Sequence, residues 1–384
     1  MNKIKFTTAG ESHGKLIMGI LEGIPSNMEI DIDYIFNQLQ RRQLGFGRGK
    51  RMQIEDDIPE ICTGVRLGKT IGAPIGIIIK NNDWKNWKNK MSIEKSDNYT
   101  TKITLPRPGH ADLAGALKYD FDDIRNVIER SSARETAMRV ALGSICRKLL
   151  EEFNIHVGSY VSSIYNVEDD NDYSMLSCKD MNKTADASPV RSLNKSIEKQ
   201  MIKIISDAKE NGDSVGGSFK VFVSGAPYGL GSYTSWDKKL NSRLGEALLS
   251  INGIKSVGVG DGISSDKKYG SQLHDEIDFI NNTFSRISNN CGGIEGGMSN
   301  GQQIILSGTM KPIPTLIKPL RSVDIKTKER LLAHKERTDS CSVPAASIIA
   351  ESMTCIVICD ALIEKFGGDS LEQLKNHVKA SAKY

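Results

Sequence analysis

The chain has 384 residues, of which 39% are hydrophobic and 26% charged, with a formal net charge of +4. This composition is typical of a soluble globular protein and excludes disordered and fibrous classes. A net charge this small gives no argument for binding to nucleic acid. The seven cysteines are scattered without a C-x-x-C pair, so neither a disulfide framework nor a metal site is predicted. We expect a cytoplasmic protein, because the N-terminus has no apolar segment typical of a secretory signal.

Segments rich in β-branched residues predict strands along the whole chain. They cover residues 4–8, 17–21, 75–79, 156–164, 219–223, 254–259 and 303–307. A helix over about 133–153 has apolar residues at every fourth position, and a second over about 343–363 is apolar around its whole circumference. The second carries Glu351 and Asp360, so it is expected to be buried on both sides and not to span a membrane. The mixture predicts an α+β fold with helices enclosed by sheet.

No internal repeat or Pro-rich linker divides the chain. We therefore expect a single domain over residues 1–384. Two polar segments, near 81–102 and 168–199, are predicted to be surface excursions from it. Trp84 and Trp87 in the first of them are expected to anchor a loop or to cover a subunit contact.

A histidine lies in a glycine-bounded turn near the N-terminus, in the segment Gly10-Glu11-Ser12-His13-Gly14. Glycines allow the backbone to approach a ligand closely, and a histidine there can move a proton near neutral pH. An ordinary turn histidine is the alternative for the motif taken alone.

Two further segments indicate anion binding. Residues 41–51 combine five cations with three glycines, a pattern that favours a loop folded around a multiply charged small anion over a solvated basic loop. Residues 129–136 are expected to open the first long helix, with Ser131 or Ser132 as N-cap and Glu135 as capping-box partner of Ser132. Cations at such a helix start are unfavourable unless an anion is bound there, and Arg130 and Arg134 flank the serines.

Three other segments carry polar or glycine-rich patterns. His110 follows Pro108-Gly109 and lies at the start of a helix expected to begin near Ala111, where the helix dipole favours a neutral imidazole or a bound anion. Residues 291–301 contain five glycines, which indicates positive φ angles or close contact with a ligand. Residues 337–341 place Arg337 near Asp339, which a simple salt bridge would also explain.

Taken together, these segments resemble the chorismate synthase family. The resemblance rests on Gly10 to Gly14 continuing to Glu22-Gly23-Ile24-Pro25, on Arg130 to Thr136, and on Arg337 to Cys341 leading to Glu351. The family's PGHAD and Lys-Pro segments are present at 108–112 and 311–315. The resemblance runs from about Lys5 to Gly367 and implies a β-α-β sandwich, with helices between antiparallel sheets, assembled as a homotetramer. Two departures, at 126–129 and at Thr338, occur together in one subgroup of the family.

The resemblance implies a lyase reaction, the anti-1,4-elimination of phosphate from 5-enolpyruvylshikimate-3-phosphate to give chorismate. This is the last common step of the shikimate pathway to aromatic amino acids, and it requires reduced FMN. His13 then matches the histidine that protonates the departing phosphate, and His110 the one that protonates reduced flavin. Asp339 matches the acid that relays a proton at flavin N5.

The same matching gives the binding residues. Flavin contacts fall on Arg130, Ser131, Ser132, Asn252, Gly253, Gly296, Lys311, Pro312, Ile313, Pro314, Thr315 and Arg337. Arg42 and Arg48 match positions assigned to a nicotinamide nucleotide (NADP), and together with Ser12 and Arg134 they are also candidates for holding the substrate. Two alternatives stay open: an added NADPH-dependent FMN reductase activity, and a flavin-binding protein without chemistry.

Overall fold

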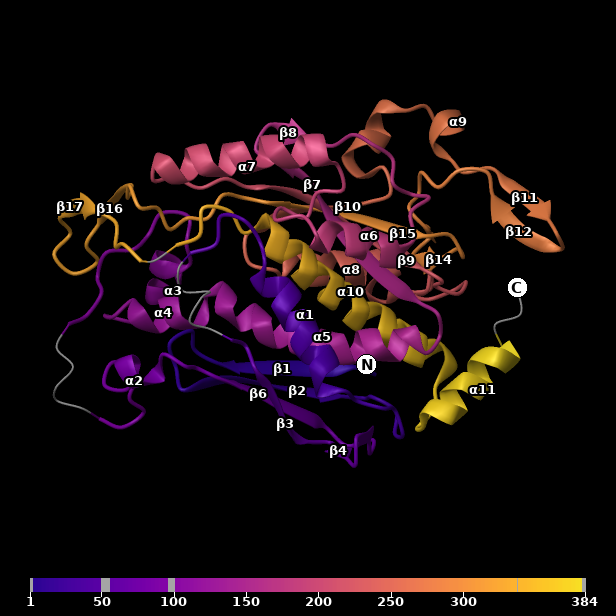
Figure 1. Cartoon of the computed structure of the whole chain (residues 1–384), viewed down its shortest axis with the longest axis horizontal. Coiled ribbons are helices and arrows are strands. Elements are labelled where there is room, and N and C mark those ends of the chain that lie inside the picture. Colours follow the sequence, from indigo (N-terminus) through magenta and orange to yellow (C-terminus); the bar gives the residue numbers. More distant parts are fainter. Residues whose placement is uncertain (1–2, 50–55, 96–100, 337, 382–384) are drawn as a thin grey trace.

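The computed structural model describes residues 3–49, 56–95, 101–336 and 338–381. Figure 1 shows two sheets with helices between them. The first sheet has the order β1-β2-β6-β3, and each neighbouring pair is antiparallel. Its strands are β1 (Lys5–Gly10), β2 (Leu16–Glu22), β3 (Pro59–Thr63) and β6 (Ile75–Lys80).

The second sheet has the order β10-β15-β9-β7-β8 and is also antiparallel. Its strands are β7 (His156–Ile164), β8 (Val167–Glu168), β9 (Gly217–Ser224), β10 (Ile254–Val259) and β15 (Ile304–Met310). All seven strands predicted from β-branched segments are confirmed within a few residues. The predicted α+β fold with helices enclosed between antiparallel sheets is confirmed.

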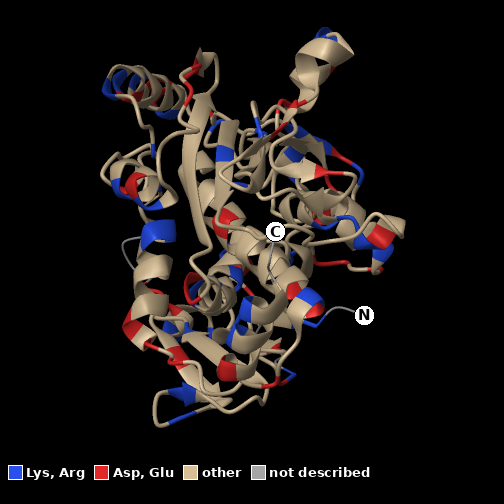
Figure 2. Ribbon diagram, turned by 90° about the vertical axis from the view of Figure 1, so that its right-hand side faces the viewer, with Lys and Arg blue, Asp and Glu red and all other residues tan. Residues whose placement is uncertain are grey.

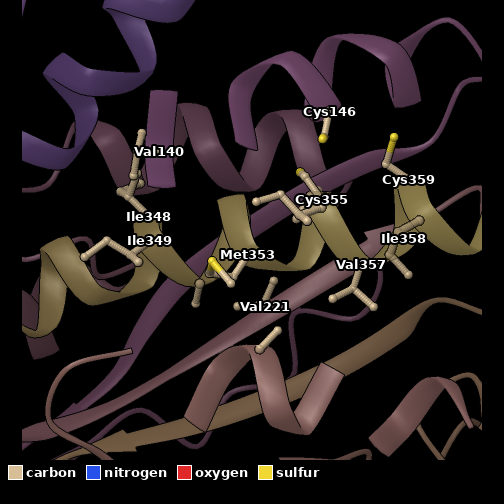
Figure 3. Packing of buried hydrophobic residues seen from close by; sticks show 14 of the residues in the cluster. Val140, Cys146, Val221, Ile348, Ile349, Met353, Cys355, Val357, Ile358 and Cys359 are labelled. Atoms are coloured by element: carbon tan, nitrogen blue, oxygen red, sulfur yellow. The ribbon is translucent and has the colours of Figure 1, made fainter. Parts of the chain in front are cut away.

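The helices between the sheets are the two long ones that the sequence predicts, with α1 (Ile32–Gln43) and α8 (Leu240–Leu249) beside them. Helix α5 (Thr136–Glu151) packs on β2 and β6, and α10 (Val343–Phe366) packs on α5, β7 and β9. All residues from 343 to 363 are buried. In Figure 3, side chains of α10 contact Val140 and Cys146 on one side and approach Val221 of β9 on the other.

A close helix crossing fixes the distance between α5 and α10. A Cβ atom placed on Gly143 of α5 would lie 2.7 Å from both the Cβ and the carbonyl oxygen of Ser352 on α10. The crossing therefore requires glycine at this position. Helix α10 is long and apolar enough to cross a membrane, but 94% of its most apolar window is buried inside the protein, as expected of a core helix.

A buried ion network ties α10 to its neighbours. Glu351 accepts hydrogen bonds from Arg41 of α1 at 2.9 Å, from Arg191 at 3.1 Å and from Arg147 of α5. Burial alone would raise the pKa of Glu351, but the three guanidinium groups lower it to about 2. Because Arg41 precedes Arg42, this network also fixes the end of α1 that faces the site described below.

The outer face of the second sheet is covered by α6 (Cys178–Asp186), while α7 (Lys195–Glu210) lies at the β8 edge and places Met201 and Ile205 in the central core. The expected surface excursion near 168–199 is therefore only partly at the surface. Cys178, Met181 and Ala185 repeat on one face of α6 and are buried with Tyr160 and Phe222. The polar composition of this segment concealed its short apolar stripe.

The remaining helices lie at the ends and edges of the sandwich. They are α2 (Trp84–Trp87), α3 (Asp112–Lys118), α4 (Arg125–Arg130), α9 (Gly270–Leu273) and α11 (Leu371–Ser381). Short strand pairs are β4 (Val65–Arg66) with β5 (Lys69–Thr70), β13 (Ile294–Glu295) with β14 (Met298–Ser299), and β16 (Arg321–Val323) with β17 (Arg330–Leu332).

A hairpin of β11 (Ile277–Ile280) and β12 (Thr283–Arg286) projects away from the body of the protein (Figure 1). Its apolar side chains are exposed, including Ile277, Phe279, Ile280 and Phe284. Elsewhere, acidic and basic residues are interspersed along the same elements (Figure 2). The local concentration of basic residues lies in a cavity at one end of the central helices.

Candidate active site

A cavity of about 400 Å³ opens where the N-terminal ends of α5 and α10 approach the β1–β2 turn. Sixteen of the residues proposed from the sequence line it. They are Ser12, His13, Arg42, Arg48, His110, Ser131, Ser132, Arg134, Asn252, Gly253, Lys311, Pro312, Ile313, Pro314, Thr315 and Asp339. The structure thus brings together segments separated by more than three hundred residues in the chain.

His13 is held in the β1–β2 turn by a buried carboxylate. Its backbone N–H donates to Glu129 Oε2 at 2.8 Å, and its Nδ1 lies 2.9 Å from the same oxygen. Trp87 stacks on the imidazole with ring centroids 3.7 Å apart. Burial would raise the pKa of Glu129, but hydrogen bonds from His13 and Arg125 lower it. A carboxylate at Nδ1 leaves Nε2 as the atom available to a ligand.

His110 has the same kind of partner. It immediately precedes the N-cap of α3, and its Nδ1 contacts Asp112, which is fully buried. Arg107 donates to Asp112 from Nε at 2.8 Å and to Thr315 Oγ1 from Nη1 at 2.8 Å. Burial would raise the pKa of Asp112, but His110 and Arg107 lower it. Both histidines that are predicted to be catalytic therefore contact an ionised carboxylate through Nδ1.

The anion expected near Arg134 is supplied by the protein itself. Arg134 forms an ion pair with Asp57, and Arg42 reaches the same carboxylate at 3.4 Å. Arg42 also donates to Thr136 Oγ1 at 3.2 Å and to the carbonyl of Ala133 at 3.0 Å. A carboxylate of the protein itself, from a distant part of the chain, thus offsets the positive charge of Arg134 at this helix start.

The helix start itself differs from the prediction. A short 3₁₀ segment, η2 (Ala133–Glu135), precedes α5, and the Ser132 side chain caps that segment by accepting from the N–H of Arg134. The capping box is wrong: Glu135 accepts instead from Thr8 at 2.6 Å and from Arg139 at 3.0 Å. The Glu135 carboxylate binds these two donors, which lie outside the turn, in place of the backbone N–H that a capping box requires.

Asp339 closes the side of the cavity next to α10. Its Oδ1 accepts from the N–H of Gly49 at 2.6 Å, while its Oδ2 lies 3.0 Å from both Arg48 Nη1 and Ser342 Oγ. Arg48 and Asp339 therefore form an ion pair across the cavity wall. The basic glycine-rich loop uses one cation to bind the C-terminal segment of the chain.

Two predicted flavin contacts among the described residues do not line this cavity. Gly296 lines a separate hollow with Asp275 and Cys291, and Arg130 is exposed and donates to the carbonyls of Gly10 and Thr8. Arg337 lies outside the described residues. Gly296 and Arg130 therefore lie outside the lining that the other described flavin-contact candidates share.

Cationic side chains outnumber acidic ones in the lining of the cavity. Among the described residues, Arg42, Arg48, Arg107, Arg134 and Lys311 line it together with Glu336 and Asp339, while Asp57 and Asp112, which do not line it, pair with three of these cations. Apolar residues such as Ile128, Ile251, Met310 and Ile349 form the rest of the lining. The arrangement can hold a flat, multiply charged anion and place two imidazoles beside it.

Comparison with known proteins gives one family over nearly the whole chain. A model of the chorismate synthase family matches residues 4–363. The chain belongs to the chorismate synthase family. The chorismate synthase of Alkaliphilus metalliredigens is 52% identical over 377 residues, with 98% of each chain covered, and that of Aquifex aeolicus is 48% identical with the same coverage.

A crystal structure of chorismate synthase has the same fold, with a TM-score of 0.79 and 37% identity, covering 99% of this chain and 97% of that one. The chain is thus a chorismate synthase, a carbon–oxygen lyase acting on a phosphate-bearing substrate. The relatives' names give no support to the alternative of an added reductase activity.

Sequence reasoning missed several residues of this chorismate synthase site. Asp57 and Trp87 reach it from segments with no recognisable motif, and Glu336 lines it beside the predicted Asp339. Glu129 and Arg107 lie inside motifs in which only neighbouring residues were predicted to act. The signal that could have identified Glu129 is a carboxylate directly before an Arg-Ser-Ser segment.

Proposed function

We propose that this cavity performs the elimination of phosphate from 5-enolpyruvylshikimate-3-phosphate, with reduced FMN bound beside the substrate. The observation that carries the proposal is the meeting of His13, His110 and five cationic side chains in one cavity. A substrate with one phosphate and two carboxylates needs cationic partners, and these side chains offer them within one cavity.

The residues present also fit a flavin. The cavity volume of about 400 Å³ lies in the range of small-molecule sites. The apolar lining suits a flat ring, while Lys311 and the hydroxyls of Ser131 and Ser132 can bind polar groups. Reduced FMN held by these residues would supply transient electron density for the elimination, with no net oxidation or reduction.

The side chains then have distinct tasks. His13 donates a proton from Nε2 to the departing phosphate oxygen, and His110 maintains the protonation of the reduced cofactor. Arg48 and Arg134 hold the substrate's anionic groups, with Arg42 fixing Arg134 through their shared Asp57. Asp339 accepts and passes on the proton released from C6, assisted by Ser12, which lines the same cavity.

Assembly and location complete the proposal. The chain works as a single domain in a cytoplasmic homotetramer, and the exposed apolar hairpin of β11 and β12 supports burial against another copy. All seven cysteines are free, which supports a reducing compartment.

An anaerobic assay with chemically reduced FMN and the enolpyruvyl substrate tests the proposal by following chorismate and phosphate. His13→Ala and His110→Ala should each lower kcat by about 10² to 10⁴-fold. His377→Ala, in α11 and outside the cavity lining, serves as control. Undiminished phosphate release from both cavity variants would instead support a flavin-binding role for the cavity without chemistry.

A further inference from the structure

A buried carboxylate, Glu129, contacts His13 although it does not line the cavity. Glu129 is 1% exposed and lies behind His13 as seen from the cavity. Its two oxygens lie 3.0 and 2.9 Å from His13 Nδ1, and one of them also accepts the backbone N–H of His13. Glu129 thus fixes both the ring and the peptide that carries it.

The carboxylate is itself fixed from a second side. Arg125, one helical turn earlier on α4, donates to Glu129 at 3.0 Å and to Glu336 at 3.0 Å. Arg125 also lies over the face of Trp87, 5.3 Å from the ring centroid, while Trp87 stacks on His13. Rotation of the imidazole would break the stacking contact and both carboxylate contacts at once.

A carboxylate at this position determines which nitrogen of the ring carries the proton. An ionised carboxylate only accepts, so Nδ1 must be the donor. The neutral ring then keeps its proton on Nδ1, and the proton on Nε2 exists only in the imidazolium form. Within the described part of the chain, the hydrogen bonds of the ring are made by Nδ1 alone.

We propose that Glu129 is a positioning residue that directs His13 Nε2 toward the cavity and stabilises the imidazolium that delivers a proton there. The inference rests on the proposed role of His13 as acid. In each turnover the Nε2–H bond breaks and a phosphate O–H bond forms, while the proton on Nδ1 stays and Glu129 remains ionised. The neutral ring then regains a proton at Nε2 from solvent. Carboxylates that orient catalytic histidines in this way act through tautomer and orientation, without becoming protonated themselves.

Glu129→Gln tests the proposal in the anaerobic chorismate assay. It should lower kcat by about 10- to 100-fold and leave KM within about 3-fold, because Glu129 does not contact the substrate. Glu135→Gln is the matched control: it removes a carboxylate that also binds an arginine but lies outside the cavity lining, and it should keep kcat within about 2-fold.

A double-mutant cycle separates positioning from a structural role. In a His13→Ala background, Glu129→Gln should change kcat by less than about 2-fold, because the group on which it acts is gone. An equal loss in both backgrounds would overturn the proposal. So would full activity of Glu129→Gln while His13→Ala is impaired. If His13→Ala itself retains full activity, the proposed role of His13 fails, and the positioning role fails with it.

A spectroscopic measurement on the wild-type enzyme does not depend on whether the variants fold. Long-range ¹H–¹⁵N spectra of histidine-labelled protein, assigned with His13→Gln, report which ring nitrogen is protonated. At a pH where His13 is neutral, we expect a protonated Nδ1 and an unprotonated Nε2. The opposite tautomer would overturn the proposal.

Discussion

The crossing of α5 and α10 gives a stability prediction in which two effects of known size oppose each other. Alanine is favoured over glycine in a helix by about 1 kcal/mol. At Gly143, however, the new methyl group would lie 2.7 Å from the carbonyl oxygen of Ser352. Overpacking of this kind costs about 1 to 3 kcal/mol, and a backbone atom inside a buried helix cannot move aside. Because the rigid backbone contact places the cost in the upper part of this range, Gly143→Ala should be net destabilising, by up to about 2 kcal/mol.

Gly245 of α8 is the matched control, since a Cβ placed there meets no heavy atom within 4 Å. Gly245→Ala gains the helix preference without the clash and should stabilise the protein by about 0.5 to 1 kcal/mol. Urea unfolding followed by circular dichroism, at one fixed protein concentration, compares the midpoints. A Gly143→Ala midpoint at or above that of wild type would refute the reasoning about the crossing.

Three further predictions follow from buried or exposed single groups. Glu351→Gln leaves three buried arginines without their shared carboxylate and should lower the free energy of unfolding by about 3 to 5 kcal/mol; an unchanged urea midpoint would contradict this. Folding lowers the pKa of the Glu351 carboxyl to about 2. Its contribution to the free energy of unfolding is therefore complete above about pH 4.3 and is lost as the pH falls toward 2. Between these pH values, the free energy of unfolding should fall less steeply in the variant than in the wild type. Native protein should react rapidly with a thiol reagent at Cys62 alone, since Cys62 is exposed and burial raises the pKa of Cys341 and Cys355 to about 12; a fast phase that persists in Cys62→Ser would be the contrary result. Lys311→Ala should weaken FMN binding by about 10-fold in a fluorescence titration, and unchanged affinity would remove Lys311 from the proposed flavin site.

The features predicted correctly are those with a local signal. Strands such as β7 and β10 show runs of β-branched residues, and α10 shows its burial in an apolar circumference. The predicted cavity residues lie in short motifs. Hydrophobic periodicity does not show which of these motifs meet in the fold, and the resemblance to a family supplied that information. The sequence alone therefore located most of the cavity wall.

The features that the sequence did not predict depend on contacts between residues that are far apart in the chain. Asp57 neutralises Arg134 from 77 positions away, and nothing local indicates that pairing. Glu135 satisfies the capping-box spacing, yet Thr8 and Arg139 bind it instead. Trp87 lies in a polar segment expected at the surface, and only the folded chain shows it stacked on His13.

The placement of α10 has a consequence for synthesis on the ribosome. Both sheets are complete before residue 343 is made, yet part of the apolar surface that they enclose is covered by α10. The nascent chain therefore exposes apolar surface of both sheets until residues 343–366 have been made and can pack between them. Chains truncated before residue 343 should aggregate and should not accumulate as inactive monomers.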